Sequence, residues 1–213
     1  MSQKIQIVSP GRVNLLGEHV DKNDGKVLPA AIDRSIKLSA EVRDDSLLKI
    51  KALDLSESVE IDLRKLDAKL DSAGRPLPSW AKYPAGVAWG LQSGGFATRG
   101  AEVEFTSNIP MGAGLSSSAA VEVAFAVLWQ SMSGWAMDRL TLSQYCQKAE
   151  VEYAGGLLVL DHSQYCGKED YELEYEVTDE VVGKEAFFTL LKERAIPIRP
   201  ADKKIARFMA AAQ

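Results

Sequence analysis

The chain has 213 residues, of which 46% are hydrophobic, and its formal net charge is −5. This composition supports a real core, and the negative charge argues against general binding to nucleic acid or to anionic membranes. No apolar run reaches the ~18 residues that span a bilayer, and the N-terminal residues read as a strand with no signal peptide. We therefore expect a cytoplasmic protein whose two cysteines, Cys146 and Cys166, are reduced thiols.

The first part of the chain is predicted to be rich in β-strands. Short apolar runs or alternating apolar and polar side chains predict strands at residues 5–8, 13–16, 35–42 and 58–63. The composition of residues 71–78 predicts a loop, and a helix is expected from about Trp80 to Gln92, with Pro84 in its first turns.

Helices dominate the middle of the chain. A strand at 101–106 leads through a glycine-rich turn into a helix from about 116 to 132. A further helix is expected from about 142 to 154, because Thr141 and Gln144 have the spacing of a capping box. Strands first and helices later, with one late strand, predict an α+β domain.

The chain changes character after Gly155. Residues 169–185 are strongly acidic and the tail from Lys184 onward is basic. We interpret the acidic run as a solvated face or loop, with a metal site as the alternative. The predicted organisation is a first domain at 1–155 and a divergent C-terminal segment at 156–213.

Residues 110–120, Pro-Met-Gly-Ala-Gly-Leu-Ser-Ser-Ser-Ala-Ala, form a strand–turn–helix junction of the kind that binds phosphate. Glycines let a backbone approach a ligand closely, and a helix N-terminus attracts anions. The three hydroxyls can donate to phosphate oxygens or ligate Mg²⁺. This pattern predicts a nucleotide triphosphate site; the alternative is a plain glycine turn with a serine N-cap. It lacks the Gly-Lys-Ser/Thr of a P-loop and fits a dinucleotide fingerprint only in part.

A second motif occupies residues 10–29, Pro-Gly-Arg-Val-Asn-Leu-Leu-Gly-Glu-His-Val-Asp-Lys-Asn-Asp-Gly-Lys-Val-Leu-Pro. Carboxylates and an imidazole close together suit a ligand rich in hydroxyls, and the guanidinium of Arg12 suits a phosphate. Residues 23–25, Asn-Asp-Gly, are ordinary turn chemistry.

Together the two motifs resemble those of the galactokinases in the GHMP small-molecule kinase family. The resemblance covers residues 5 to about 155, and it includes the helix from Trp80 to Val87. The sequence departs from the first signature at Val20 and Lys22, where the family has threonine and tyrosine. The resemblance implies a mixed sheet backed by helices, like domain 2 of ribosomal protein S5, and phosphoryl transfer from MgATP to the 1-hydroxyl of galactose.

The resemblance also implies a role for each site residue. Sugar hydroxyls would be held by Glu18, His19 and Asp21. Arg12 would neutralise charge near the γ-phosphate, and Asp161 would accept or orient the hydroxyl proton. The phosphates would lie against Gly112, Gly114, Ser116, Ser117 and Ser118. Ser117 and Glu150 would hold Mg²⁺.

Two departures leave a second interpretation open. In galactokinases the catalytic aspartate stands in Gly-Ile-Met-Asp-Gln, whereas Asp161 lies one position nearer to Glu150 than that pattern requires and is followed by His162. Without the family role, Asp161 would be a turn or helix-cap residue. The family's C-terminal half, with its third motif, is not in this sequence. We therefore expect a truncated form: a fragment, a miscalled gene product, or a divergent protein that kept only the N-terminal domain. Its expected partners are galactose and ATP, and association with a missing C-terminal half is left open. The alternative function is a non-catalytic protein that binds sugar and nucleotide.

Overall fold

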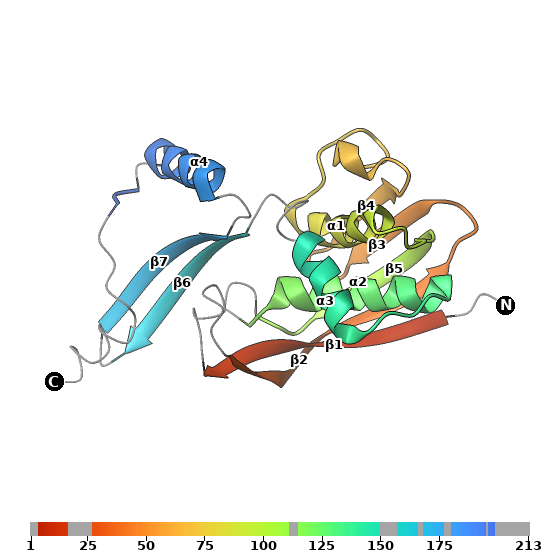
Figure 1. Ribbon diagram of the computed structural model, residues 1–213, viewed down its shortest axis with the longest axis horizontal. Helices are drawn as coiled ribbons and strands as arrows, with labels where there is room; N and C mark the ends of the chain where they lie inside the picture. The colour runs from red at the N-terminus through yellow and green to blue at the C-terminus, as the bar shows by residue number, and fades with distance from the viewer. Residues whose placement is uncertain are drawn as a thin grey trace. The chain divides into compact units, whose positions relative to one another are not determined.

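The computed structural model describes residues 4–16, 27–110, 115–149, 157–165, 168–176, 180–194 and 196–198. The chain separates into two compact units, residues 1–154 and 155–213 (Figure 1). Within the described residues, no helix is both long enough and apolar enough to cross a membrane.

The first unit contains a five-stranded mixed sheet. Its strands are β1 (Lys4–Leu16), β2 (Leu28–Val42), β3 (Leu47–Ala52), β4 (Glu57–Asp62) and β5 (Ala101–Ser107). They lie in the order β1-β2-β5-β3-β4, and every neighbouring pair is antiparallel except β3 and β5. The α+β prediction is confirmed.

The predicted strands are present, with three differences. The strands expected at 5–8 and 13–16 are one strand, β1, because its pairing with β2 continues through a register irregularity between Pro10 and Arg12. The strand expected at 35–42 begins seven residues earlier, at Leu28, because it pairs with the whole of β1. The third difference is β3, which sequence analysis missed although Leu48, Ile50 and Ala52 alternate with lysines.

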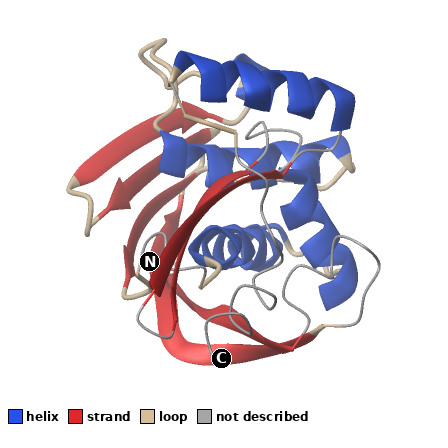
Figure 2. Ribbon diagram, turned by 90° about the vertical axis from the view of Figure 1, so that its left-hand side faces the viewer, coloured by secondary structure: helices blue, strands red, loops and turns tan. Residues whose placement is uncertain are grey.

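Helices cover one face of this sheet (Figures 1 and 2). They are the short 3₁₀ helix η2 (Leu66–Ala68), α1 (Ser79–Ser93), α2 (Ser117–Ser133) and α3 (Arg139–Lys148). The predicted α1 and α2 agree with the structure to within one residue at each end. Helix α2 packs on β1 and β2 and also contacts α1 and α3.

The predicted start of α3 is wrong. Its N-cap is Asp138, whose carboxylate accepts hydrogen bonds from the backbone N–H of Thr141 at 3.0 Å and from its hydroxyl at 2.6 Å. These bonds hold the pKa of Asp138 below its usual value, with the Thr141 hydroxyl as the largest cause. Thr141 is therefore inside the first turn of α3. The carboxylate of Asp138, three residues earlier, accepts a hydrogen bond from a backbone N–H group that has no partner within the helix.

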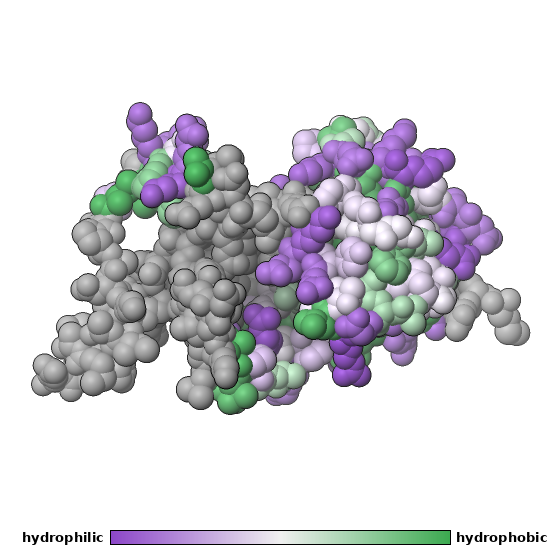
Figure 3. Space-filling model, viewed as in Figure 1, coloured by the Kyte–Doolittle hydropathy of each residue, from purple (hydrophilic) through white to green (hydrophobic). Residues whose placement is uncertain are grey.

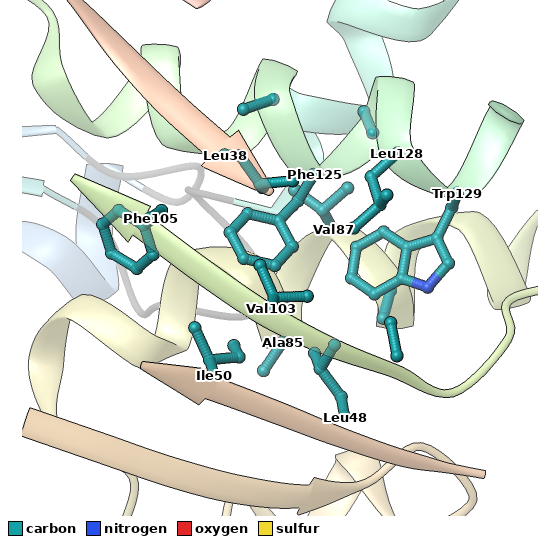
Figure 4. Packing of buried hydrophobic residues seen from close by; sticks show 14 of the residues in the cluster. Leu38, Leu48, Ile50, Ala85, Val87, Val103, Phe105, Phe125, Leu128 and Trp129 are labelled. Atoms are coloured by element: carbon teal, nitrogen blue, oxygen red, sulfur yellow. The ribbon is translucent and has the colours of Figure 1, made fainter. Parts of the chain in front are cut away.

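The core lies between the sheet and the helices (Figure 4). On the inner face of three adjacent strands, Val103 of β5 pairs with Ala40 of β2 and with Ile50 of β3, and all three are almost fully buried. The aromatic rings of Phe125 and Trp129 reach this layer from α2, with their centroids 5.8 Å apart. This burial holds α2 against the sheet.

The second unit consists of a hairpin and a helix. Strands β6 (Leu157–Tyr165) and β7 (Lys168–Glu176) pair antiparallel, and α4 (Glu180–Glu193) follows them. The acidic run at 169–185 therefore lies mostly in β7 and α4. The prediction of a loop at these residues is wrong. Tyr171, Leu173 and Tyr175 alternate with acidic residues, and this period of two is typical of a strand.

Candidate functional site

The two sequence motifs meet in the first unit. The backbone N–H of Arg12, on β1, donates a hydrogen bond to the carbonyl oxygen of Leu115 at 3.2 Å. Leu115 is the described residue that follows the glycine-rich turn, and β1 carries the first part of the other motif. The two motifs, about a hundred residues apart in the chain, are thus in direct contact. This agrees with the prediction that both contribute to one site for sugar and nucleotide.

Gly11 makes this approach feasible. A Cβ at this position would lie 2.8 Å from the carbonyl oxygen of Leu115 and 3.2 Å from the Cδ1 atoms of Ile109 and Ile32. The first of these is a backbone atom, so the contact cannot be relieved by turning a side chain. Gly11 is therefore required by the contact between β1 and the residues on either side of the glycine-rich turn.

The start of α2 has an uncommon backbone conformation. Ser116 occupies the N-cap position with φ 55° and ψ 46°, in the left-handed region. A non-glycine residue there costs on the order of 1 kcal/mol, and such residues gather at functional sites. The Ser116 side chain makes no capping hydrogen bond, which differs from the ordinary serine cap that the alternative interpretation requires.

The structure describes only part of the predicted site. Arg12 is exposed on β1, and Ser117 and Ser118 are half-buried in the first turn of α2. The remaining residues of the first unit lie outside the described ranges: Glu18, His19, Asp21, Gly112, Gly114 and Glu150.

Asp161 belongs to the second unit. It lies within β6, where its backbone pairs with Glu172 of β7. The alternative role as a turn or helix-cap residue is therefore wrong, because strand pairing continues on both sides of it. The catalytic role of Asp161 stays a prediction.

The predicted Mg²⁺ ligands are chemically suited to the ion. A serine hydroxyl and a carboxylate are hard oxygen donors of the kind that Mg²⁺ takes beside phosphate and water. Ser117 is in the first turn of α2, next to the glycine-rich turn. Among the described residues, no three His, Cys, Asp or Glu side chains gather in a way that could hold a metal.

A hollow of about 550 Å³ lies elsewhere, over the outer face of β3, β4 and β5. The charged side chains around it pair with one another: Lys49 with Glu60 at 3.0 Å and Lys51 with Glu104 at 3.2 Å. These pairs belong to the polar outer face of the sheet. We therefore assign no ligand to this hollow. The opposite side of the first unit, seen in Figure 3, has mixed polar and apolar areas on its described surface.

Sequence analysis missed two residues beside the glycine-rich turn. Asn108 immediately precedes Ile109 and Pro110, so its position next to the motif was an available signal. Asp54 lies in the turn between β3 and β4 and has no sequence signal at all. Its carboxylate reaches the end of β5 only because β3 and β5 are parallel neighbours.

Gly11→Ala is expected to lower the free energy of unfolding by about 1–3 kcal/mol, the usual range for overpacking. The reason is the 2.8 Å approach of the new methyl group to the Leu115 carbonyl oxygen. Urea unfolding followed by circular dichroism measures the change. Gly90→Ala in α1 is the matched control, since its Cβ would have 3.4 Å to the nearest atom and alanine is the better helix former. Equal stability of Gly11→Ala and the unchanged chain would contradict this account of Gly11.

Comparison with family models gives three matches along the chain. The galactokinase galactose-binding signature matches residues 2–41, and the N-terminal domain of GHMP kinases matches residues 82–160. A CYTH domain model matches residues 139–209, which include all of the described second unit. The chain thus carries two kinds of family signal that overlap around α3 and the start of β6.

Two curated relatives are galactokinases. The enzyme of Streptomyces coelicolor is 39% identical over 148 residues, which are 69% of this chain and 37% of that protein. The enzyme of Roseiflexus sp. (strain RS-1) is 35% identical over 211 residues, covering 95% of this chain and 49% of that protein. The chain therefore spans half or less of the length of these relatives.

Solved structures agree with the sequence matches. Galactokinase of Lactococcus lactis complexed with galactose has a TM-score of 0.65 at 28% identity, over 81% of this chain and 47% of that one. A mevalonate kinase, at 18% identity and a TM-score of 0.57, shows the fold alone. The mixed sheet backed by helices is the N-terminal domain of the GHMP kinases, as the resemblance implied. Within that family, the N-terminal part of this chain belongs to the galactokinases.

Proposed function

We propose that the first unit binds MgATP and galactose as the N-terminal half of a galactokinase. The observation that carries this proposal is the contact of Gly11 and Arg12 with Leu115, because it joins the galactose-binding signature to the glycine-rich turn. The reaction would transfer the γ-phosphoryl group of ATP to the 1-hydroxyl of galactose, in the cytoplasm.

Catalysis of this kind consists of positioning and charge stabilisation. In the proposal, Glu18, His19 and Asp21 orient the sugar through its hydroxyls. Arg12 stabilises negative charge on the phosphoryl group, which fits its exposed place beside the turn. The glycines and serines at 112–118 hold the phosphates, and Mg²⁺ bound by Ser117 and Glu150 would neutralise phosphate charge.

The proposal gives Asp161 the role of orienting or accepting the hydroxyl proton. The alignment with the Roseiflexus galactokinase supports a kinase assignment of the second unit, since 95% of the chain is covered and β6 with Asp161 must lie inside the aligned part. The CYTH match over 139–209 supports the opposite assignment, in which the second unit is a separate domain with no part in the kinase site. The same match favours the alternative function, a protein that binds sugar and nucleotide without turning them over.

Titration calorimetry with MgATP or a non-hydrolysable analogue tests the nucleotide site. Binding is expected for the unchanged chain, and Gly114→Val should abolish it because a branched side chain would stand against the phosphates. Ala73→Val, in the turn beside β4, is the control for adding methyl groups to an exposed turn. Undiminished binding by Gly114→Val would remove the assignment of the glycine-rich turn.

A further inference from the structure

The end of β5 is held by a carboxylate from another part of the chain. Asp54 accepts hydrogen bonds from the hydroxyl of Thr106 at 2.8 Å and from the backbone N–H of Ser107 at 2.5 Å. The backbone N–H of Leu53 also donates to the carbonyl oxygen of Phe105 at 3.0 Å. The turn between β3 and β4 is thereby fastened to the last residues of β5.

A second set of bonds holds the next residues. The side-chain oxygen of Asn108 accepts from the backbone N–H of Ser35 at 2.7 Å, and its own backbone N–H donates to the Ser35 carbonyl at 3.3 Å. The backbone N–H of Ile109 donates to the hydroxyl of Ser107 at 3.1 Å. Ile109 is almost fully buried, so the chain is anchored from Thr106 up to the residue before Pro110.

We propose that Asp54 and Asn108 are positioning residues for the phosphate-binding turn, an inference that rests on the proposed function. Glycine-rich segments lose much conformational entropy when they are ordered around a ligand. Fixed ends reduce the number of conformations that such a segment can adopt. Asp54 and Asn108 fix the end at which β5 leaves the sheet, and the bond from Arg12 to Leu115 fixes the end at which α2 begins.

The residue types fit this role. Thr106 and Ser107 offer two donors, an O–H and an N–H, and the two carboxylate oxygens of Asp54 accept one each. Alanine at position 54 removes both acceptors, whereas asparagine keeps one acceptor and can donate its amide N–H to the Thr106 hydroxyl, which is also an acceptor. At position 108 one side-chain acceptor is needed for the Ser35 N–H, and aspartate supplies that as well as asparagine does.

The test compares Asp54→Ala, Asn108→Ala and Asn108→Asp with the unchanged 213-residue chain. MgATP affinity is expected to fall at least about three- to tenfold in the first two, the equivalent of at least one lost hydrogen bond in each. Asn108→Asp should keep the affinity, because it keeps the acceptor. Galactose affinity, measured in the same calorimeter, should stay unchanged in all three variants.

Asp71→Ala is the matched control. Asp71 also accepts backbone bonds within a turn, from Ala73 and Arg75 at 2.9 and 2.8 Å, but that turn lies beside β4. It should leave MgATP affinity unchanged even where it lowers the thermal midpoint. An equal loss of affinity in Asp71→Ala would show that the Asp54 substitution acts through general stability, and it would overturn the proposal.

Hydrogen exchange of the peptides that cover residues 107–118 provides a readout that needs no nucleotide. Exchange should be faster in Asp54→Ala and Asn108→Ala than in the unchanged chain, and not in Asp71→Ala or Asn108→Asp. Unchanged exchange in the first two variants overturns the positioning role. If the unchanged chain binds no MgATP while exchange responds as expected, the proposed function fails and the anchoring of the turn stands.

Discussion

Galactose 1-phosphate formation by the 213-residue chain alone is expected to be far below the range of about 1–100 per second that is typical of kinases. A kinase cleft must hold both substrates in line and exclude water. The matched part of the chain covers 37% and 49% of the two galactokinase relatives. The 213 residues therefore supply one wall of the proposed cleft, and the other wall is missing from the assay. The measurement is a coupled assay with galactose and MgATP on chain purified away from host galactokinase.

A full-length galactokinase such as the Streptomyces coelicolor relative is the positive control for this assay. Turnover by the short chain in the typical range would contradict the half-site argument. Any slower turnover can be assigned with Asp161→Asn, which keeps the shape of the side chain and removes its basicity. Loss of that turnover would support Asp161, whereas its survival would favour the CYTH assignment of the second unit and move the search to another carboxylate, beginning with Asp170.

Asp21→Ala is expected to weaken galactose binding at least about tenfold while MgATP binding stays unchanged. A carboxylate that accepts two sugar hydroxyls makes charge-assisted hydrogen bonds worth about 1.5–3 kcal/mol each. Even one of them corresponds to a change of about tenfold or more. Calorimetric titration of the chain with galactose, and separately with MgATP, measures the two affinities.

Asp24→Ala is the matched control for this substitution. Asp24 lies three positions away in the same motif, within the Asn-Asp-Gly segment that we interpret as ordinary turn chemistry. It removes the same charge and should leave galactose affinity unchanged. Equal galactose affinity in Asp21→Ala and the unchanged chain would show that the signature does not bind sugar through Asp21.

Local signals in the sequence predicted most elements of the first unit. Strands β2, β4 and β5 alternate apolar and polar side chains because one face of the sheet is buried against α1 and α2. Helix α2 was predicted to within one residue because its apolar run is long. The start of α3 was placed three residues late because Asp138 and Thr141 are both residues that can cap a helix, and only their geometry shows which one does.

In the second unit the same local reasoning failed for β7. The acidic residues there suggested a loop or a solvated face by composition, and the alternating Tyr171, Leu173 and Tyr175 received no weight. The strand became evident from its pairing with β6. Composition is a weak guide to whether a segment forms a strand, since every second residue of a strand can be polar without interrupting it.

The sequence by itself determined which chemical groups this protein brings to a ligand. The motifs at 10–29 and 110–120 are each contiguous in the chain. Their residue types and order therefore point to a family without any knowledge of which segments lie side by side.

Tertiary structure alone decided that the two motifs are in contact, through Gly11, Arg12 and Leu115. It also decided that Asp54, in a turn without any motif, supports the end of β5. Such contacts depend on the parallel pairing of β3 with β5 and on the antiparallel pairing of β1 with β2. Strand pairing joins residues far apart in the chain, and local side-chain patterns do not specify which strands become neighbours.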